Sequence, residues 1–299
     1  MSTPPDSVTP PGAAVVAPVA PVAPAVSAAA GCPAGRVDVS DEGVHWDLKR
    51  AQTYGGYLDL ERVLDAQHPR SGSHDEMLFI VVHQASELWM KLCLHELRAA
   101  IGCIVRDDLD PCFKMLSRIS RIQHQLVQSW DVLATMTPAD YSSFRNDLGP
   151  ASGFQSWQYR QLEFLLGNKN RDLVRVHRAD PDAHAALERT LHAPSLYDEA
   201  LRLLSRRGFE LPAECLEQVT AAWLAVYHSV DAHWDLYELA EKLIDLDHQF
   251  QLWRYAHLKT VERIIGYKRG TGGTGGVSYL AKALELRFFP ELWAVRTSM

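Results

Sequence analysis

The sequence predicts an all-α protein. Apolar residues recur with helical periodicity from about residue 37 to the C-terminus, and the only strand-like run, residues 79–82, is embedded in a long helical pattern. No repeat of 20–50 residues is visible, which argues against a solenoid. The 299 residues are 47% hydrophobic, enough to build a sizeable core. We therefore expect a single large helical domain over residues 37–299.

The first 36 residues differ in composition from the rest of the chain. Eight of the 16 prolines fall at or before Pro33, and residues 12–31 are mostly Ala, Val and Pro. The first basic residue is Arg36, so the charged start of a signal peptide is missing. We expect residues 1–36 to be a disordered Pro/Ala-rich tail.

Start signals and glycine breaks predict the helices in order. Thr137, Pro138 and Asp140 form a strong start signal, because Thr can cap the helix and Pro suits its first position. The expected helices cover residues 74–105, 111–133, 137 to about 150, 154–166, 195–207, 213–247, 247–265 and 277–286. The glycine-rich run 270–276 follows a helix and lacks the phosphate-loop ending, so it predicts a mobile lid.

Charge, cysteine usage and missing motifs exclude several classes. The net charge is −7 and no block of five or six basic residues occurs, which argues against nucleic acid and anionic membranes. No run of 18 apolar residues occurs, so we expect no membrane-spanning helix. Five cysteines without a Cys-x-x-Cys pair indicate free thiols in a reducing, cytoplasmic setting. The zinc-protease and nucleophile-elbow motifs do not occur.

His257 is the first candidate for chemistry. It shares one helix face with Phe250, Trp253, Val261 and Ile264, at spacings of three and four. On spacing alone, a core histidine with one hydrogen bond is the favoured interpretation. The alternative is an axial haem ligand, because haem is a flat apolar disc that needs one imidazole from a hydrophobic wall.

Two further pairs suggest a substrate pocket. His83 lies one turn after Phe79, and this pair would suit an indole ring with its N–H. Tyr141 and Arg145 are four residues apart, so they point the same way and could clamp a carboxylate. Core packing for the first pair and a solvated surface for the second are the simpler alternatives.

Several strings resemble the tryptophan 2,3-dioxygenase family in order and approximate spacing, over most of residues 53–299. The strings are Thr53-Tyr54-Gly55-Gly56-Tyr57-Leu58, His74-Asp75-Glu76-Met77-Leu78-Phe79-Ile80, His83-Gln84, Glu87-Leu88-Trp89, Phe144-Arg145, Ser152-Gly153-Phe154-Gln155-Ser156, Gln158-Tyr159-Arg160, Trp253-Arg254-Tyr255-Ala256-His257, Lys268-Arg269-Gly270-Thr271-Gly272-Gly273 and Phe288-Phe289-Pro290-Glu291-Leu292-Trp293. Residues 171–247 match less distinctively.

The resemblance implies an all-helical homotetramer that carries one haem b per subunit and uses O2 to cleave the indole C2–C3 bond of L-tryptophan, giving N-formylkynurenine. By this resemblance His257 is the proximal iron ligand, His83 the distal histidine that meets the indole N–H, and Phe79 lines the indole pocket. Arg145 with Tyr141 would hold the substrate carboxylate, and the loop would contribute Thr271 or Thr274.

The resemblance also assigns a haem pocket and a shared site. Trp130, Ser152 and Gly153 would line the haem pocket. Tyr54 and Tyr57 would enter the active site of a neighbouring subunit, although from the residues alone such aromatics usually serve packing.

Three alternatives remain open at this point. A broader indoleamine dioxygenase would share the chemistry with another substrate range. A helical haem sensor or carrier would keep His257 but would not need the Tyr141–Arg145 pair. In a haem-free helical scaffold every histidine would be structural, and an absorption spectrum without a Soret band would identify that case.

Overall fold

The computed structural model describes residues 39–49, 51–211 and 215–299. The predicted tail, residues 1–36, lies outside them. The chain divides into two units, Met1–Leu60 and Glu61–Met299, and the second contains almost all of the helices. The part of the chain that is described holds helices and no strand, which confirms the predicted fold class.

The α-helices follow one another with short 3₁₀ turns between some of them. They are α1 (Tyr54–Leu58), α2 (Leu60–Leu64), α3 (Asp75–Val105), α4 (Leu109–Leu133), α5 (Pro138–Phe144), α6 (Trp157–Leu166), α7 (Pro181–His192), α8 (Leu196–Arg206), α9 (Leu216–His228), α10 (Trp234–Ile265), α11 (Val277–Ala283) and α12 (Pro290–Ser298). The 3₁₀ helices are η1 (Arg145–Leu148), η2 (Gly153–Gln155), η3 (Arg171–His177) and η4 (Val230–Ala232).

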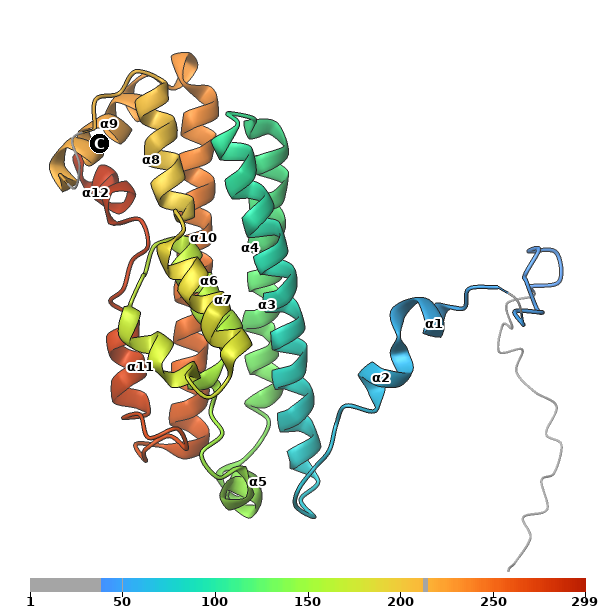
Figure 1. Cartoon of the computed structure of the whole chain (residues 1–299). Coiled ribbons are helices and arrows are strands. Elements are labelled where there is room, and N and C mark those ends of the chain that lie inside the picture. The colour runs from blue at the N-terminus through green and yellow to red at the C-terminus, as the bar shows by residue number, and fades with distance from the viewer. Residues whose placement is uncertain (1–38, 50, 212–214) are drawn as a thin grey trace, which may run out of the picture. The chain divides into compact units, whose positions relative to one another are not determined.

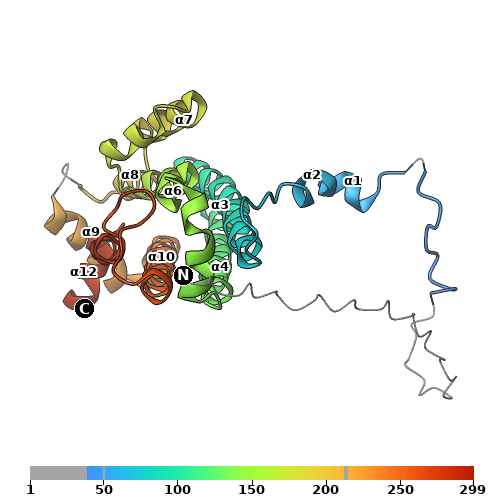
Figure 2. The ribbon, with the colours of Figure 1, turned by 90° about the horizontal axis from the view of Figure 1, so that it is seen from below.

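Three long helices form the frame of the second unit. α4 packs against both α3 and α10, and the three run side by side in Figures 1 and 2. α6 and α8 cover α3, while α12 packs mainly on α9. α5 contacts α3 and α10 at the end of the bundle where α3 begins and α10 ends. The predicted site residues on the long helices lie toward this same end.

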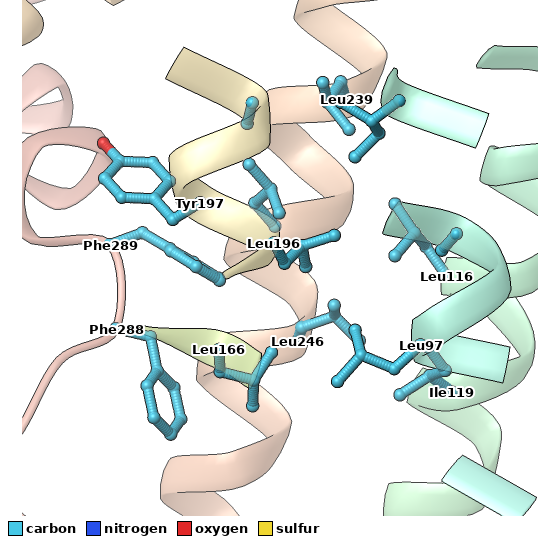
Figure 3. Close-up of a cluster of buried hydrophobic side chains, with 14 of the residues drawn as sticks. Leu97, Leu116, Ile119, Leu166, Leu196, Tyr197, Leu239, Leu246, Phe288 and Phe289 are labelled. Carbon is cyan, nitrogen blue, oxygen red and sulfur yellow. The ribbon is translucent and has the colours of Figure 1, made fainter. Parts of the chain in front are cut away.

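The core of the bundle is built from leucine, isoleucine and aromatic side chains of these helices. Leu97 of α3, Leu116 of α4 and Leu239 of α10 are at most 1% exposed, and Figure 3 shows them with Leu196 of α8 and Phe289. Burying such a side chain stabilises a fold by about 1.5–3 kcal/mol. This apolar layer therefore fixes how the long helices are placed relative to one another.

α3 by itself has the length and apolar composition of a membrane-crossing helix. It packs against α4, α6 and α8, and its Leu94, Leu97 and Ile104 lie in the main core. A central helix of a bundle has this same composition, because it meets neighbours on several sides. We describe α3 as such a helix.

Local signals set the helix starts that matter for the site. The Thr137 side chain accepts from the amide of Asp140, and the Asp140 carboxylate accepts from the amide of Thr137, so the predicted cap of α5 is a capping box. α5 nevertheless ends at Phe144, and the chain continues as η1. Arg145 therefore stands at the junction between α5 and η1, one turn after Tyr141.

The prediction of one helix over residues 213–247 is wrong. α9 ends at His228, η4 follows, and α10 begins at Trp234, so the last long helix starts well before the expected residue 247. Ser229 and His233 have φ near −130°, outside the helical range, which turns the chain between α9 and α10. Periodicity continues on both sides of the break and therefore does not reveal it.

The sequence analysis did not predict α1, α2, α7 and α12, although the last two have a recognisable start signal. α7 begins with Pro181 after the capping residue Asp180, and α12 begins with Pro290. Both therefore carry a proline at the first helical position, a start signal that was readable. The predicted helix over 154–166 is shorter than expected, because residues 153–155 form η2 and α6 starts at Trp157.

Candidate functional site

Two histidines from different long helices are joined by a cluster of aromatic rings. Trp130 of α4 stacks on His257 of α10, with ring centroids 4.5 Å apart and planes at 9°. The same indole meets His83 of α3 edge-on at 6.5 Å. Phe79 lies 4.1 Å from the His83 ring. The structure therefore brings together four residues that the sequence spreads over 178 positions, from 79 to 257.

Aromatic rings flank His257. Burial lowers its pKa to about 4, with a smaller effect from His83, and no hydrogen bond from the described residues contributes. Trp253, one turn earlier on α10, contacts the His257 ring at 5.7 Å. The imidazole is thus neutral at physiological pH, and a neutral imidazole nitrogen is what a metal ion requires. The interpretation of His257 as a core histidine with its own hydrogen bond is not what the described residues show.

His83 has a defined tautomer because of a backbone contact. Its Nδ1 lies 2.7 Å from the carbonyl oxygen of Phe79, so Nδ1 carries the proton and donates. Burial lowers the pKa of His83, against the opposing effects of that carbonyl and of Glu87. The ring is therefore neutral, and its Nε2 is left as a hydrogen-bond acceptor. An acceptor beside a phenyl ring suits a planar heterocycle with an N–H group.

Tyr141 and Arg145 line a polar pocket next to the aromatic cluster. This pocket measures about 270 Å³ and is also lined by Glu262 and Lys268. The Tyr141 ring is buried 6.2 Å from Phe79, so it forms a wall common to the pocket and the cluster. Burial raises the pKa of Tyr141, which keeps its hydroxyl protonated as a donor, although Arg145 opposes the shift.

Arg145 is held by the chain segment before the glycine-rich loop. Its Nη2 donates to the carbonyl oxygen of Arg269 at 2.6 Å. Its Nε is buried and has no hydrogen-bond partner among the described residues. An orphaned guanidinium N–H costs free energy unless a ligand satisfies it. An incoming carboxylate is the group that would do so, because it can accept from two N–H donors at once.

The glycine-rich loop, residues 270–276, rests on the segment before η2. Thr271 Oγ1 donates to the carbonyl oxygen of Ala151 at 2.5 Å. A Cβ on Gly272 would lie 2.7 Å from the Cβ of Ser152, so glycine is required for this approach. The structure thus places Thr271 and Ser152 together. Thr274 Oγ1 lies beside Gly270, where an added Cβ would be 3.0 Å away, inside the loop itself.

Some predicted residues are not placed at the cluster. Ser152 caps η2 and lies against Gly272 of the loop, and Gly153 is the first residue of η2. Tyr54 and Tyr57 belong to the first unit, where their side chains are 77% and 72% exposed. Such exposure of two neighbouring tyrosines is typical of a surface that meets another molecule.

Sequence reasoning placed one residue, Trp253, on the helix face of His257 without giving it a role in the site. Trp253 contacts both His257 and Trp130, at 5.7 and 5.8 Å, and so completes the aromatic wall. Its position on the same helix face as His257, four residues earlier, was the signal that could have identified it.

The residues fit a flat, apolar, iron-carrying cofactor. No group of three or more His, Cys, Asp or Glu side chains gathers within residues 39–49, 51–211 and 215–299, so these residues offer no all-protein metal cage. They offer instead two neutral imidazoles, those of His257 and His83, in one aromatic cluster, and the Trp130 Nε1 is buried without a partner among the same residues. Haem needs one axial histidine and apolar surroundings. The fold and site together define a helical-bundle protein with two buried histidines in an aromatic cluster, beside a pocket lined by Tyr141 and Arg145.

Comparison with known proteins identifies the family. Its model, described as tryptophan 2,3-dioxygenase, matches residues 39–221 and 202–299. A tryptophan 2,3-dioxygenase of Erythrobacter litoralis is 62% identical over 258 residues, covering 83% of this chain and 98% of the relative. Proteins named tryptophan 2,3-dioxygenase 1 from Ralstonia nicotianae and tryptophan 2,3-dioxygenase from Burkholderia pseudomallei are 54% and 58% identical, over 91% and 85% of this chain and 97% and 86% of theirs. The chain belongs to the tryptophan 2,3-dioxygenase family.

Proposed function

We propose that this chain is a haem-dependent enzyme that uses O2 to cleave the indole C2–C3 bond of L-tryptophan, giving N-formylkynurenine, the first step of tryptophan catabolism by the kynurenine pathway. Family membership at 54–62% identity over most of the chain supports the reaction. The single observation that carries the proposal is the neutral His257 in an aromatic cluster that also contains His83, beside the Tyr141–Arg145 pocket.

The cofactor in this proposal is one haem b per subunit, whose iron His257 would bind. Trp130 and Trp253 supply apolar surface for it, and the Trp130 N–H, which has no acceptor among the described residues, could donate to it. Ser152 and Gly153 line the pocket from η2. When bound, the haem iron supplies the oxygen chemistry, and the protein supplies orientation and a dry environment.

Different residues bind the indole ring and the amino-acid end of the substrate. His83 Nε2 accepts from the indole N–H while Phe79 and Tyr141 pack against the ring. Arg145 holds the carboxylate, and Thr271 or Thr274 meets the amino-acid end from the loop. Closure of the loop over the pocket would exclude water. His83 is neutral, and the indole N–H is a very weak acid, so His83 orients the substrate rather than removing this proton completely.

The assembly and location belong to the same proposal. The enzyme is a cytoplasmic homotetramer in which Tyr54 and Tyr57 of one subunit enter the active site of a neighbour. Their exposure supports this role, because two bare tyrosine rings gain contact area when a second surface covers them. Residues 37–299 act as one catalytic domain, with no nucleic-acid or membrane partner.

Reconstitution with haem provides the decisive experiment. The protein is reduced without oxygen in the presence of haem, L-tryptophan and air are added, and N-formylkynurenine is followed by its absorption. We expect a Soret band and product from the wild-type chain, and loss of haem retention in His257→Ala. Normal haem occupancy with an unchanged ligand spectrum in His257→Ala would rule out this histidine as the iron ligand. A wild-type chain that never shows a Soret band would rule out the enzyme.

A further inference from the structure

A buried ion network lies between α6 and α10 and takes no direct part in the site. Glu163 of α6 accepts from Arg160 Nη1 at 2.5 Å and from Arg254 Nη2 of α10 at 3.0 Å. All three side chains are only 3–4% exposed. Two guanidinium groups therefore share one carboxylate out of contact with water, an arrangement that is costly unless every group is well held.

Aromatic faces compensate for the unpaired positive charge. The Arg160 guanidinium lies 5.0 Å from the ring centroid of Phe154, and the Arg254 guanidinium lies 4.8 Å from that of Phe250. Cation–π contacts of this kind are strongest where water is excluded. Tyr159 also donates to Glu163 at 3.1 Å. Ion pairs, a hydrogen bond and aromatic faces thus hold the network, in which only the Nε of Arg254 is buried without a partner among the described residues.

One arm of this network reaches the helix of the proposed iron ligand. Arg254 precedes His257 by three residues on α10, less than one helical turn. Its Nη1 also donates to the carbonyl oxygen of Leu286 at 3.1 Å, after α11. Tyr159, bound to the same carboxylate, packs on Trp253 at 5.2 Å, and Trp253 contacts His257. Any rotation of α10 that moved His257 would have to break these contacts.

The other arm reaches the segment on which the glycine-rich loop rests. Arg160 covers Phe154 in η2, two residues after Ser152. Tyr279 of α11, just beyond the loop, packs edge-on against the Phe154 ring, with centroids 5.7 Å apart. Ser152 is the residue against which Gly272 closes, and Ala151 accepts from Thr271. Arg160 therefore holds the surface that receives the loop.

We propose that Glu163 is a positioning residue that couples the two halves of the site, holding the His257 helix through Arg254 and the loop-receiving segment through Arg160. Glu163 touches neither substrate nor cofactor in this assignment. The inference rests on the proposed function, since it concerns the iron ligand and the substrate loop. Its consequence is that each arm can be weakened separately, with a different effect on the enzyme.

Conservative arginine-to-lysine variants separate the two arms. Lysine keeps the charge but loses the planar fork, so each variant weakens one arm without leaving Glu163 unpaired. Arg254→Lys should release haem to apomyoglobin faster by about tenfold, as expected when the support of a metal ligand is lost, and should shift the iron–histidine stretching band. Arg160→Lys should leave the rate of haem release and the iron–histidine band nearly unchanged. It should instead raise the KM for L-tryptophan and speed amide hydrogen exchange in residues 270–276.

Glu163→Gln should produce both effects together. The matched control is Glu96→Gln, which removes another buried carboxylate, 7% exposed and paired with Arg118 at 2.7 Å. Glu96 lies thirteen residues beyond His83 on α3, about 20 Å along the helix and away from the site. We expect it to lower the melting temperature without changing the iron–histidine band or the exchange of the loop.

Two outcomes would overturn the coupling. In the first outcome, Glu163→Gln and Glu96→Gln lower the melting temperature equally, and Glu163→Gln changes haem release and loop exchange no more than Glu96→Gln does. The other is a pair of arginine variants with the same profile, which would indicate general loosening. Both comparisons require a wild-type chain that retains haem and oxidises tryptophan. A failure of the proposed function would therefore be seen in the wild-type chain, before any variant is compared.

Discussion

His83 and Arg145 acquire their properties from neighbours that are close in space and, for Arg145, distant in sequence. The carbonyl of Phe79 sets the tautomer of His83, and the carbonyl of Arg269 directs one nitrogen of Arg145 while its Nε stays unpaired. Each residue therefore presents one defined group to a ligand: an acceptor from His83 and donors from Arg145. These assignments give separate predictions for the two ends of the substrate.

The acceptor on His83 should matter only when the substrate has an indole N–H. We expect His83→Ala to lose much of its activity with L-tryptophan yet retain some, because the residue orients the ring and is not required as a base. With 1-methyl-L-tryptophan, which has no N–H to donate, the same substitution should cost considerably less. Steady-state rates for both substrates measure this difference. Complete loss of turnover with L-tryptophan, with haem and substrate still bound, would show that His83 is indispensable.

The guanidinium of Arg145 should select the carboxylate. Charge-assisted hydrogen bonds are worth about 1.5–3 kcal/mol each, so Arg145→Ala should lower kcat/KM for L-tryptophan by at least about tenfold. Arg145→Lys should recover only part of this loss, because it keeps the charge without the fork. The Arg145→Ala enzyme should also discriminate less against indole analogues that lack the carboxylate. Unchanged kcat/KM for L-tryptophan would place the carboxylate clamp elsewhere.

At the scale of elements, the site depends on how two connections meet. The segment before η2 and the glycine-rich loop are separated by more than a hundred residues, yet Thr271 donates to the carbonyl of Ala151 and Gly272 closes on Ser152. The distance of 2.7 Å from an added Cβ to the Ser152 Cβ is too short for any real contact, so a side chain at residue 272 must displace the loop.

Gly272→Ala should therefore raise the KM for L-tryptophan and leave haem retention intact. The added methyl group prevents the loop from resting on Ser152, while the His257 helix is unaffected. The double variant Gly272→Ala with Ser152→Gly removes both atoms that the new Cβ meets, and it should recover part of the affinity. If Gly272→Ala leaves the KM unchanged, the loop closes by a route that does not pass Ser152.

At the scale of the whole molecule, the proposal requires more than one subunit. Tyr54 and Tyr57 are exposed in the first unit of the chain, and the described residues of the second unit hold the histidines, Arg145 and the loop. If tyrosines of a neighbouring subunit complete the active site, catalysis depends on assembly of the subunits. This arrangement can be tested by mixing subunits that are inactive for different reasons.

Hybrid tetramers should regain activity. One parent carries Tyr54→Ala with Tyr57→Ala, and the other carries His257→Ala. In a hybrid, the intact histidine site of the first parent can meet the intact tyrosines of the second, because the two defects lie in different parts of the shared site. Activity of mixtures refolded or coexpressed together measures this complementation. Hybrids that form, as shown by two affinity tags, and remain inactive would contradict the shared site.

Much of the fold and the residues proposed for the site could be predicted from the sequence, because both predictions depend on local patterns. The periodicity of α3 and α4 and the start signal of α5 need only neighbouring residues, and His257 lies on a recognisable aromatic stripe. The family strings supplied roles that spacing alone left open between core packing and chemistry. The break between α9 and α10 escaped detection, because a change in chain direction leaves apolar periodicity intact on either side.

Only the tertiary structure decided which residues act together. The stacking of Trp130 on His257, the orphaned Nε of Arg145 and the Glu163 network each join residues from separate helices. Their burial removes water as a competing partner. It lowers the pKa of His257 to about 4, and it strengthens the interaction of the shared Glu163 carboxylate with the two guanidinium groups. Local sequence signals were enough to predict most of the long helices and the chemical groups that they carry. Desolvation and the contacts between distant elements determined what those groups can do, since neither is encoded at any single position.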